Sequence, residues 1–321
     1  MANPVIALAM GDPCGISPEL TAKVVALDEV QKAARVIVIG DRRVFDEGAR
    51  IAAITPTVEF VDLKHLDPAT VQRGVASKAG GASALANYRH ALRMAADGKA
   101  QAVCFTPFNK QAMRLAHPPY EDEIGFTSGV LGFKGAATEF NILEGLWNAR
   151  VTSHIPLAKV SSSLSVDSIV QALELTATAL RVAGVQPPRI GVAALNPHAG
   201  DGGNFGREEI DIIEPAVKKA KAKGLPADGP YPADTVFVRA KAGQFDAVLT
   251  MFHDQGQIAM KLLGFDRGVT LLGGYPFPIC TPAHGTAYDI AGKGIANVGA
   301  ARAALLLAAR MARESGAQRR Q

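Results

Sequence analysis

The chain has 321 residues, of which 48% are hydrophobic and 20% are charged, a composition typical of a folded globular protein rather than a disordered or fibrous one. The formal net charge is only +4, and the basic residues are scattered along the chain up to Arg319-Arg320 near its end, which argues against nucleic-acid binding. The three cysteines form no Cys-x-x-Cys pair, which argues against a thiolate zinc site or a disulfide framework. No apolar run approaches the ~20 residues that span a bilayer, and no basic segment precedes the first apolar run as in a signal peptide. We therefore expect a cytoplasmic protein with neither a membrane nor a nucleic acid as partner.

Strand-like and helical segments alternate along the chain. The predicted buried strands include residues 5–10, 35–40, 57–61 and 102–106. The predicted helices include residues 18–27, 82–96, 166–183 and 207–223. Such alternation implies crossover connections and a largely parallel α/β sheet.

The length suggests about two domains, but no Gly-Ser-rich or Pro-rich linker separates them. We therefore expect the middle of the chain to be inserted into the first domain. The expected boundaries give one domain of residues 1–125 plus 266–321 and an inserted domain of residues 126–265.

Three of the seven histidines, His154, His198 and His253, each follow an apolar run that predicts a buried strand. Ligands of open α/β sheets bind outside the carboxyl ends of the strands. Three imidazoles delivered there from three strands could bind one divalent metal and leave coordination positions for a substrate.

Residues 11–19 join the first predicted strand to the first predicted helix. Ser17 is suited to the N-cap of that helix, Pro18 to its first position, and Glu19 to the positive end of its dipole. A capped turn and a ligand-binding turn explain this segment equally well.

Residues 196–209 follow a strand and precede a helix. Gly200, Gly202 and Gly206 have the spacing G-x-G-x-x-x-G, which is not the dinucleotide-binding fingerprint. Because His198 precedes these glycines, we interpret the segment as a ligand loop.

Residues 284–297 are dense in small side chains, which suits a backbone that wraps around a flat ligand. Asp289 in this segment could accept a hydrogen bond from a ribose hydroxyl, and its charge would repel a 2′-phosphate.

Together these segments resemble the 4-hydroxythreonine-4-phosphate dehydrogenase (PdxA) family of vitamin B6 synthesis. The similarity extends over nearly the whole chain, through residues 11–19, 107–110, 196–209, 232–235, 253–256 and 284–287. The resemblance implies the isocitrate and isopropylmalate dehydrogenase-like fold, a two-domain α/β/α architecture with a largely parallel mixed sheet. Residues 284–297 are also similar to the adenosine-binding loop of isopropylmalate dehydrogenases, in which an acid at the position of Asp289 favours NAD over NADP.

The resemblance further implies that His154, His198 and His253 bind one divalent metal at the interface of a homodimer. NAD would oxidise a metal-held substrate hydroxyl, and the resulting β-keto acid would lose carbon dioxide. The metal is not distinguished among zinc, cobalt, nickel, iron, manganese and magnesium. The implied NAD-binding residues are Gly15, His284, Gly285, Thr286, Ala287, Asp289 and Asn297. The candidates for the general base are Lys110, Asp234, Asp254 and Lys261.

The substrate-contacting positions depart from the family pattern. Aligned without gaps from Lys110, a His-Thr pair of the family becomes Glu123-Ile124, an asparagine becomes Thr270 and an arginine becomes Ile279, while Lys261 is retained. Loss of an arginine removes a bidentate anion partner, and a carboxylate would repel a phosphate. These changes imply a different hydroxy-acid substrate, either a sugar-acid phosphate or a carboxylated ring cis-dihydrodiol such as that of terephthalate breakdown. Ile124 and Ile279 would suit an apolar ring.

Two alternatives stand beside this interpretation. In the first, the chain catalyses the family's own oxidation of 4-hydroxythreonine 4-phosphate, with the phosphate held by other groups. In the second, it is a non-catalytic protein that binds a sugar acid or a metal on an enzyme fold, because a fold alone does not determine a function.

Overall fold

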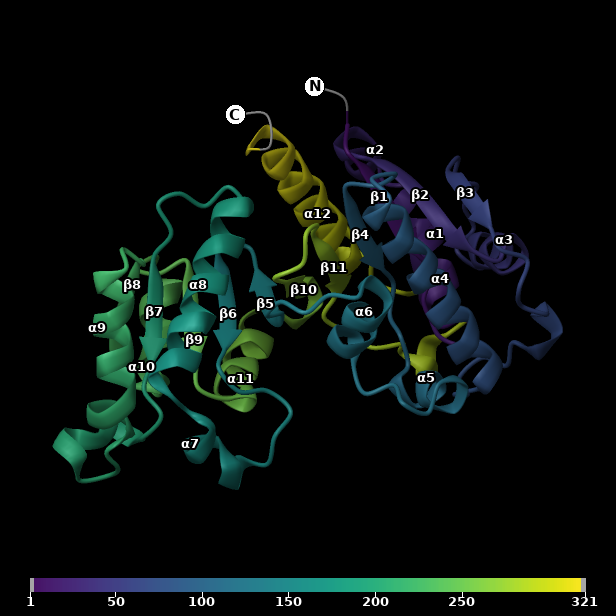
Figure 1. Ribbon diagram of the computed structural model, residues 1–321. Coiled ribbons are helices and arrows are strands. Elements are labelled where there is room, and N and C mark those ends of the chain that lie inside the picture. The colour runs from purple at the N-terminus through teal and green to yellow at the C-terminus, as the bar shows by residue number, and fades with distance from the viewer. Residues whose placement is uncertain (1–2, 319–321) are drawn as a thin grey trace. The chain divides into compact units, whose positions relative to one another are not determined.

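The computed structural model describes residues 3–318. The chain forms two compact units, Met1–Ala136 with Asp266–Gln321 as unit 1 and Ala137–Phe265 as unit 2. Unit 1 is drawn in purple, blue and yellow and unit 2 in teal and green (Figure 1). The first unit boundary follows helix α6 (Glu123–Leu131), 11 residues after the position expected from the sequence.

The sheet of unit 1 has the strand order β3-β2-β1-β4-β11-β10. Neighbouring strands are parallel except for β10, which is antiparallel to β11. The strands are β1 (Val5–Ala9), β2 (Arg35–Gly40), β3 (Glu59–Asp62), β4 (Ala102–Phe105), β10 (Val269–Gly273) and β11 (Ile279–Pro282). Apart from α6, the helices are α1 (Ser17–Val25), α2 (Asp28–Ala33), α3 (Arg42–Ile51), α4 (Lys78–Ala96), α5 (Lys110–Ala116) and α12 (Gly299–Gln318).

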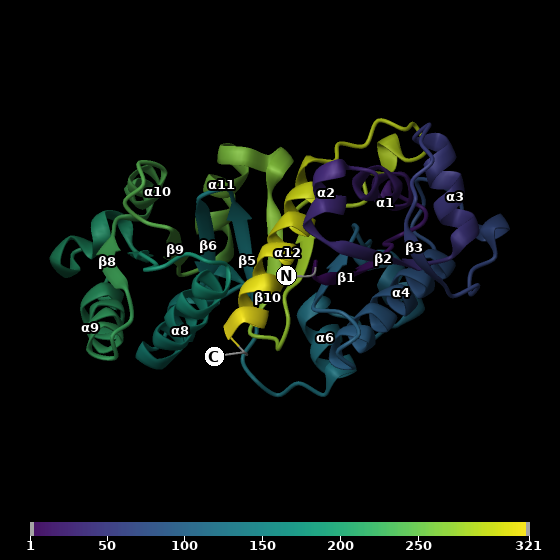
Figure 2. The ribbon, with the colours of Figure 1, turned by 90° about the horizontal axis from the view of Figure 1, so that it is seen from above.

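Helices cover both faces of this sheet. In Figure 2, α1, α2 and α3 lie on one side of β1 to β3, and α4 and α6 lie on the other. The core between α4 and the sheet is aromatic and aliphatic, with Tyr88 packed against Phe105 at a ring distance of 4.8 Å and with Leu272 and Ile279 in the same cluster.

The sheet of unit 2 has the strand order β5-β6-β9-β7-β8. Strand β5 is antiparallel to β6, and β6, β9, β7 and β8 are parallel to one another. The strands are β5 (Thr138–Leu143), β6 (Leu146–Arg150), β7 (Ile190–Ala193), β8 (Ala227–Tyr231) and β9 (Ala247–Thr250). The helices are α7 (Val160–Ser163), α8 (Val166–Val182), α9 (Glu214–Ala222), α10 (Ala233–Lys241) and α11 (His253–Gly264). Helices α10 and α11 lie on one side of the strands, and α8 and α9 lie on the other (Figure 2).

The predicted strands and helices are confirmed within a few residues, and both units are α/β/α layers with mostly parallel strands. Two local predictions are wrong. Residues 209–213 form a π-helical turn before α9 rather than the start of one regular helix. The Ser17 side chain does not cap α1, because its hydroxyl donates to the carbonyl of Pro107 at 2.9 Å instead. Within residues 3–318, no helix is both long and apolar enough to cross a membrane.

Candidate functional site

The three predicted metal ligands follow three strands that are neighbours in unit 2. His154 follows β6, His253 follows β9 and His198 follows β7, and these strands lie in the order β6-β9-β7. Since the strands are parallel, their carboxyl ends lie at one edge of the sheet, the edge at which α/β proteins bind ligands. Asp234, at the start of α10, follows the carboxyl end of β8 at the same edge.

His154 and His253 lie close together at this edge, with their ring centres 5.7 Å apart. The Nδ1 atom of His253 is 2.7 Å from a carboxylate oxygen of Asp254. When the Nδ1 proton donates to that carboxylate, Nε2 keeps its lone pair free, which is the arrangement typical of a metal-ligating imidazole.

His198 lies in a left-handed turn. Residues 198–202 all have positive φ, from 46° at Asp201 to 81° at Gly200. This conformation costs a residue other than glycine roughly 1–2 kcal/mol, and such strain is characteristic of functional loops. Among residues 3–318, however, no three histidine, cysteine, aspartate or glutamate side chains lie close enough to hold a metal ion. The structure therefore pairs His154 with His253 and does not bring His198 into the same group within one chain.

The segment before His198 is held by a glutamate that the sequence did not single out. One carboxylate oxygen of the buried Glu209 accepts the backbone N–H groups of Leu195 and Asn196 at 2.8 and 2.7 Å. The other oxygen accepts the side-chain amide of Asn196 at 2.9 Å. Glu209 thus anchors the backbone from which the left-handed turn starts.

In unit 1, the turn of residues 11–19 contacts the predicted nucleotide loop directly. The backbone N–H of Ile16 donates to the carbonyl of Thr286 at 3.0 Å. A Cβ atom on Gly15 would lie 2.6 Å from that carbonyl oxygen, so only glycine permits this approach. The turn of residues 11–19 is therefore a partner of the loop as well as a strand-to-helix connection.

A buried acid reinforces this contact. Asp12 accepts the phenol proton of Tyr288 with one carboxylate oxygen and the backbone N–H of Cys14 with the other. Burial raises the pKa of Asp12 above its ordinary value, whereas the two hydrogen bonds oppose that rise.

Of the predicted NAD-binding residues, Gly15 and Thr286 contact each other. Thr286 is buried, His284 and Ala287 are partly buried, and Gly285, Asp289 and Asn297 are exposed. A cavity of about 400 Å³ in unit 1 borders this region, and its wall includes Gly15, Glu19, Arg73 and Gly292.

Lys110 and Glu123 form an ion pair. The Lys110 Nζ atom lies 3.4 Å from a Glu123 carboxylate oxygen, which joins the start of α5 to the start of α6. Next to Glu123, the carbonyl of Ile124 accepts the phenol proton of Tyr275 at 2.9 Å. Part of the Glu123 charge is therefore offset by Lys110.

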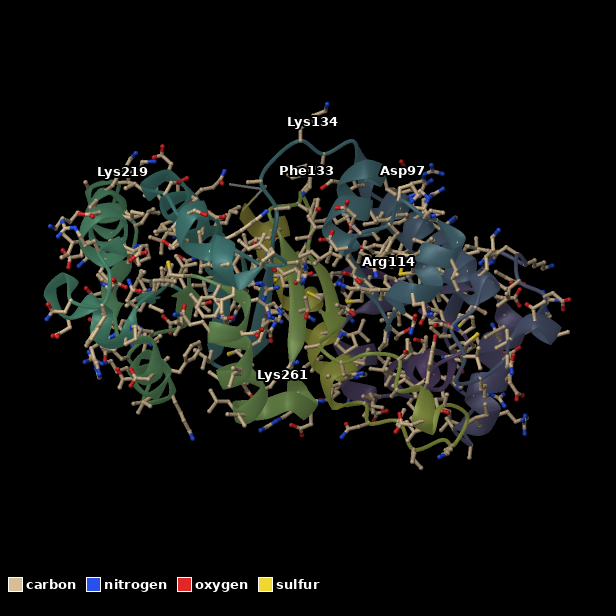
Figure 3. The ribbon with its side chains drawn as sticks, turned by 90° about the horizontal axis from the view of Figure 1, so that it is seen from below. Asp97, Arg114, Phe133, Lys134, Lys219 and Lys261 are labelled. Carbon is tan, nitrogen blue, oxygen red and sulfur yellow. The ribbon has the colours of Figure 1, made fainter. Side chains whose placement is uncertain are left out.

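The other predicted substrate contacts differ in their exposure. Ile279 is 0% exposed and packs in the core with Val103 and Leu272, so its side chain is closed to solvent. Thr270 lies on β10 and is partly buried. Lys261 is exposed on α11, two turns after His253 (Figure 3).

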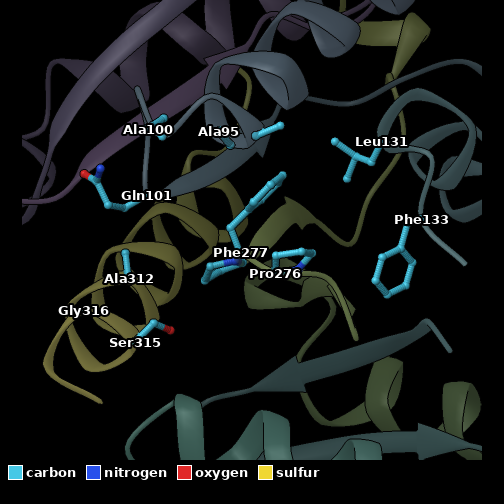
Figure 4. A pocket seen from close by; sticks show the side chains of 13 residues that line it. Ala95, Ala100, Gln101, Leu131, Phe133, Pro276, Phe277, Ala312, Ser315 and Gly316 are labelled. Carbon is cyan, nitrogen blue, oxygen red and sulfur yellow. The ribbon is translucent and has the colours of Figure 1, made fainter. Parts of the chain in front are cut away.

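A separate pocket of about 410 Å³ in unit 1 is lined by apolar side chains that include Leu131, Phe133 and Phe277 (Figure 4). Two of its other lining residues, Gln101 and Pro278, directly precede β4 and β11. Because β1, β4 and β11 are parallel, this pocket lies at the opposite edge of the sheet from the turn of residues 11–19. It does not belong to the candidate site.

Residues 32–308 match the family model described as pyridoxal phosphate biosynthetic protein PdxA. The chain is 62% identical to a protein of Rhizobium meliloti named 4-hydroxythreonine-4-phosphate dehydrogenase 2, over 98% of this chain and 95% of the relative. It is 36% identical to a protein of Symbiobacterium thermophilum named D-threonate 4-phosphate dehydrogenase, over 92% of each chain.

Two solved structures are also similar. The 4-hydroxythreonine-4-phosphate dehydrogenase of Klebsiella pneumoniae has a TM-score of 0.84 and 33% identity, over 97% of this chain and 98% of the other. The terephthalate 1,2-cis-dihydrodiol dehydrogenase of Burkholderia xenovorans has a TM-score of 0.69 and 30% identity, over 96% of this chain and 98% of the other.

Proposed function

The chain belongs to the PdxA family of dehydrogenases, and we propose on this premise that it oxidises a hydroxy acid with NAD and a divalent metal. Loss of carbon dioxide from the resulting β-keto acid would complete the reaction. The observation that carries this proposal is the His154–His253 pair, with Asp254 on the Nδ1 atom of His253, at the carboxyl edge of the unit 2 sheet.

The donor set fits a divalent metal. Neutral imidazoles suit zinc, cobalt, nickel and iron, and Asp254 orients one of them. A bound metal would stabilise negative charge on the substrate oxygen while bound NAD accepts the hydride. In this proposal His154 and His253 hold the metal, and Asp254 keeps the Nε2 lone pair of His253 directed to it.

We assign the third imidazole, His198, to a second copy of the chain. In one chain His198 does not join the other two, and the family resemblance implies a metal site at a homodimer interface. Large apolar side chains are exposed on the segments that carry the histidines, namely Ile155, Leu157, Phe205, Ile258 and Leu262. Exposed apolar surface of this kind is typical of protein–protein interfaces.

The nucleotide side of the reaction belongs to unit 1 in this proposal. The backbone of residues 284–287 follows the carboxyl end of β11, and the carboxylate of Asp289 is exposed. An exposed carboxylate can accept a hydrogen bond from the ribose hydroxyl of NAD and would repel the 2′-phosphate of NADP.

Among the candidates for proton transfer, Asp254 contacts His253 and Lys110 contacts Glu123. Asp234 and Lys261 are exposed at the start of α10 and on α11. Because Lys261 is two turns from the metal ligand His253 on one helix, it is the first of the four to test. A Lys261→Met variant should lose most of its kcat at every pH if this lysine transfers the proton.

The substrate that we propose is a phosphorylated four-carbon sugar acid, the class named for three relatives at 35–37% identity, although other relatives at 37% identity are named for 4-hydroxythreonine 4-phosphate. The ion pair with Lys110 offsets the charge of Glu123, so Glu123 opposes a phosphate less than an isolated carboxylate would. A carboxylated ring cis-dihydrodiol receives less support, because Ile279 lies in the core. The second candidate is 4-hydroxythreonine 4-phosphate, the substrate named for relatives at 62% and 47% identity.

A substrate panel tests the proposal. The purified protein is supplied with NAD and with zinc, cobalt, nickel, iron, manganese or magnesium in turn, and NADH formation is followed with D-threonate 4-phosphate, 4-hydroxythreonine 4-phosphate and the terephthalate dihydrodiol. Faster turnover of the sugar acid supports the proposed substrate, and turnover of 4-hydroxythreonine 4-phosphate alone would replace it. Tight NAD binding without turnover of any hydroxy acid would favour a non-catalytic binding protein instead.

A further inference from the structure

We propose that Glu19 and Lys23 of α1 are positioning residues that hold residues 292–296 in the backbone conformation that binds NAD. This inference rests on the proposed function. The local sequence pattern does not reveal this contact, because it predicts only that Glu19 complements the helix dipole.

The contact consists of five hydrogen bonds between α1 and one loop. The Glu19 carboxylate accepts the backbone N–H groups of Gly292 and Gly294, each at 3.2 Å, and that of Ala296 at 3.4 Å. Lys23 Nζ donates to the carbonyl oxygens of Gly294 and Ala296 at 2.6 and 3.1 Å. Glu19 and Lys23, one helical turn apart, thus bind the N–H groups and the carbonyl oxygens of the same loop, residues 292–296.

Two glycines allow the loop to adopt the conformation that this contact requires. Gly292 and Gly294 have φ of 79° and 70°, the left-handed region that favours glycine. A Cβ atom on Gly294 would lie 2.6 Å from the carbonyl oxygen of Ile51. The alternate side chains, Lys293 and Ile295, are exposed on the loop.

The burial of Glu19 indicates that its carboxylate does more than complement the helix dipole. Glu19 is 1% exposed, and its carboxylate is held by three loop amides. Burying a carboxylate is costly unless hydrogen bonds replace its water, and three amide donors do so here. A loop ordered before the ligand arrives does not have to be ordered on binding, so the contact should increase NAD affinity.

The central test is Glu19→Gln. Glutamine has one acceptor oxygen, and its NH₂ group would face N–H donors, so at least one loop amide loses its partner without a change of side-chain size. The matched control is Glu29→Gln on α2, where an exposed glutamate pairs with Arg302. For each protein we would measure the hydrogen exchange of the amides of residues 292–296 without ligand, the Kd for NAD by calorimetry, and kcat at saturating NAD.

We expect Glu19→Gln to speed exchange of the amides of Gly292, Gly294 and Ala296 at least tenfold and to raise the Kd for NAD at least tenfold. Its kcat should stay within about threefold of the parent, because the contact acts on binding. The control should change neither quantity by more than about twofold. Unchanged exchange, or faster exchange with unchanged NAD affinity, would overturn the proposal.

A second variant, Lys23→Met, guards against loss of folding in the first. It removes two donors, keeps the apolar stem and leaves Glu19 in place, so we expect smaller effects in the same direction; no effect on either quantity would count against the proposal. Failure of the proposed function is distinguishable, because the exchange of the ligand-free protein tests the contact even if the parent protein binds no NAD.

Discussion

At the scale of single residues, a few acids each hold another group in place. Asp254 orients His253, Glu209 holds the backbone before His198, and Glu19 holds residues 292–296. The histidines could be predicted from their places after strand-like runs. The glutamates could not, because their partners depend on how loops fold back onto helices.

Replacing Asp254 by Asn tests the orientation of His253. The amide can still accept a hydrogen bond through its oxygen, but it lacks the charge that fixes the tautomer, so metal affinity should fall roughly 10- to 100-fold. Calorimetric titration with zinc and cobalt measures this. Asp167→Asn, at an exposed aspartate paired with Lys219, should bind metal like the parent, and equal affinity in both variants would remove Asp254 from the site.

The raised pKa of Asp12 predicts that the free energy of unfolding depends on pH. Burial raises its pKa in the folded state above the ordinary 3.8, so the folded state binds the proton more tightly than the unfolded state. Stability is therefore lost as the pH rises from about 3.8 through the raised pKa. The Asp12→Asn variant has no titrating group at this position. In urea titrations, the free energy of unfolding of the parent should therefore fall relative to that of the variant as the pH rises over this range.

Asp41 provides the control of opposite sign. Hydrogen bonds from Arg43 lower the pKa of Asp41, so its contribution is present above pH 3.8 and is lost as the pH falls below that value. The difference between the parent and Asp41→Asn should therefore stay constant from pH 5 to 7 and shrink toward pH 3. A parent-minus-variant difference for Asp12 that rises with pH would contradict the assigned burial effect.

At the scale of elements, parallel strand order brings the candidate ligands to one edge. Hydrophobic periodicity predicted β6, β7 and β9 within a few residues, but their order β6-β9-β7 is a property of long-range pairing. Helix α11 starts with His253 and continues with the exposed Ile258 and Leu262. Helix α11 therefore carries both a candidate metal ligand and an apolar surface that is exposed in the single chain.

Leu262→Asp tests that surface. Leu262 is 83% exposed, so a charge there should not disturb the monomer, but it would oppose burial in a dimer interface. We expect light scattering after gel filtration to show a dimer for the parent and a shift toward monomer for the variant. Val238→Asp on α10, at 66% exposure, is the matched control; the same mass for all three proteins would argue against α11 as an interface.

At the scale of the whole molecule, the two units carry different parts of the proposed reaction. The predicted nucleotide residues lie in unit 1, and the predicted metal ligands lie in unit 2. A ligand that binds only the folded state stabilises it by about 2.7 kcal/mol at one hundred times its Kd. Each ligand should therefore slow hydrogen exchange mainly in the unit that binds it.

We expect NAD alone to slow hydrogen exchange mainly in residues 284–297, and zinc alone mainly in residues 151–155 and 253–257. The metal-free protein with and without each ligand provides the comparison, measured by mass spectrometry of peptides. Protection of unit 2 by NAD alone, with none in residues 284–297, would contradict the proposed division of roles.

Local sequence patterns suffice to predict the α/β class, the approximate strands and helices, and the positions of the candidate histidines after their strands. These features depend on periodicity and turn chemistry within a few neighbouring residues. Which side chains meet follows only from the three-dimensional structure: Glu19 with a loop more than 270 residues later, Lys110 with Glu123, and Ile279 with the core. These contacts arise from the packing of distant segments, and no local pattern encodes them.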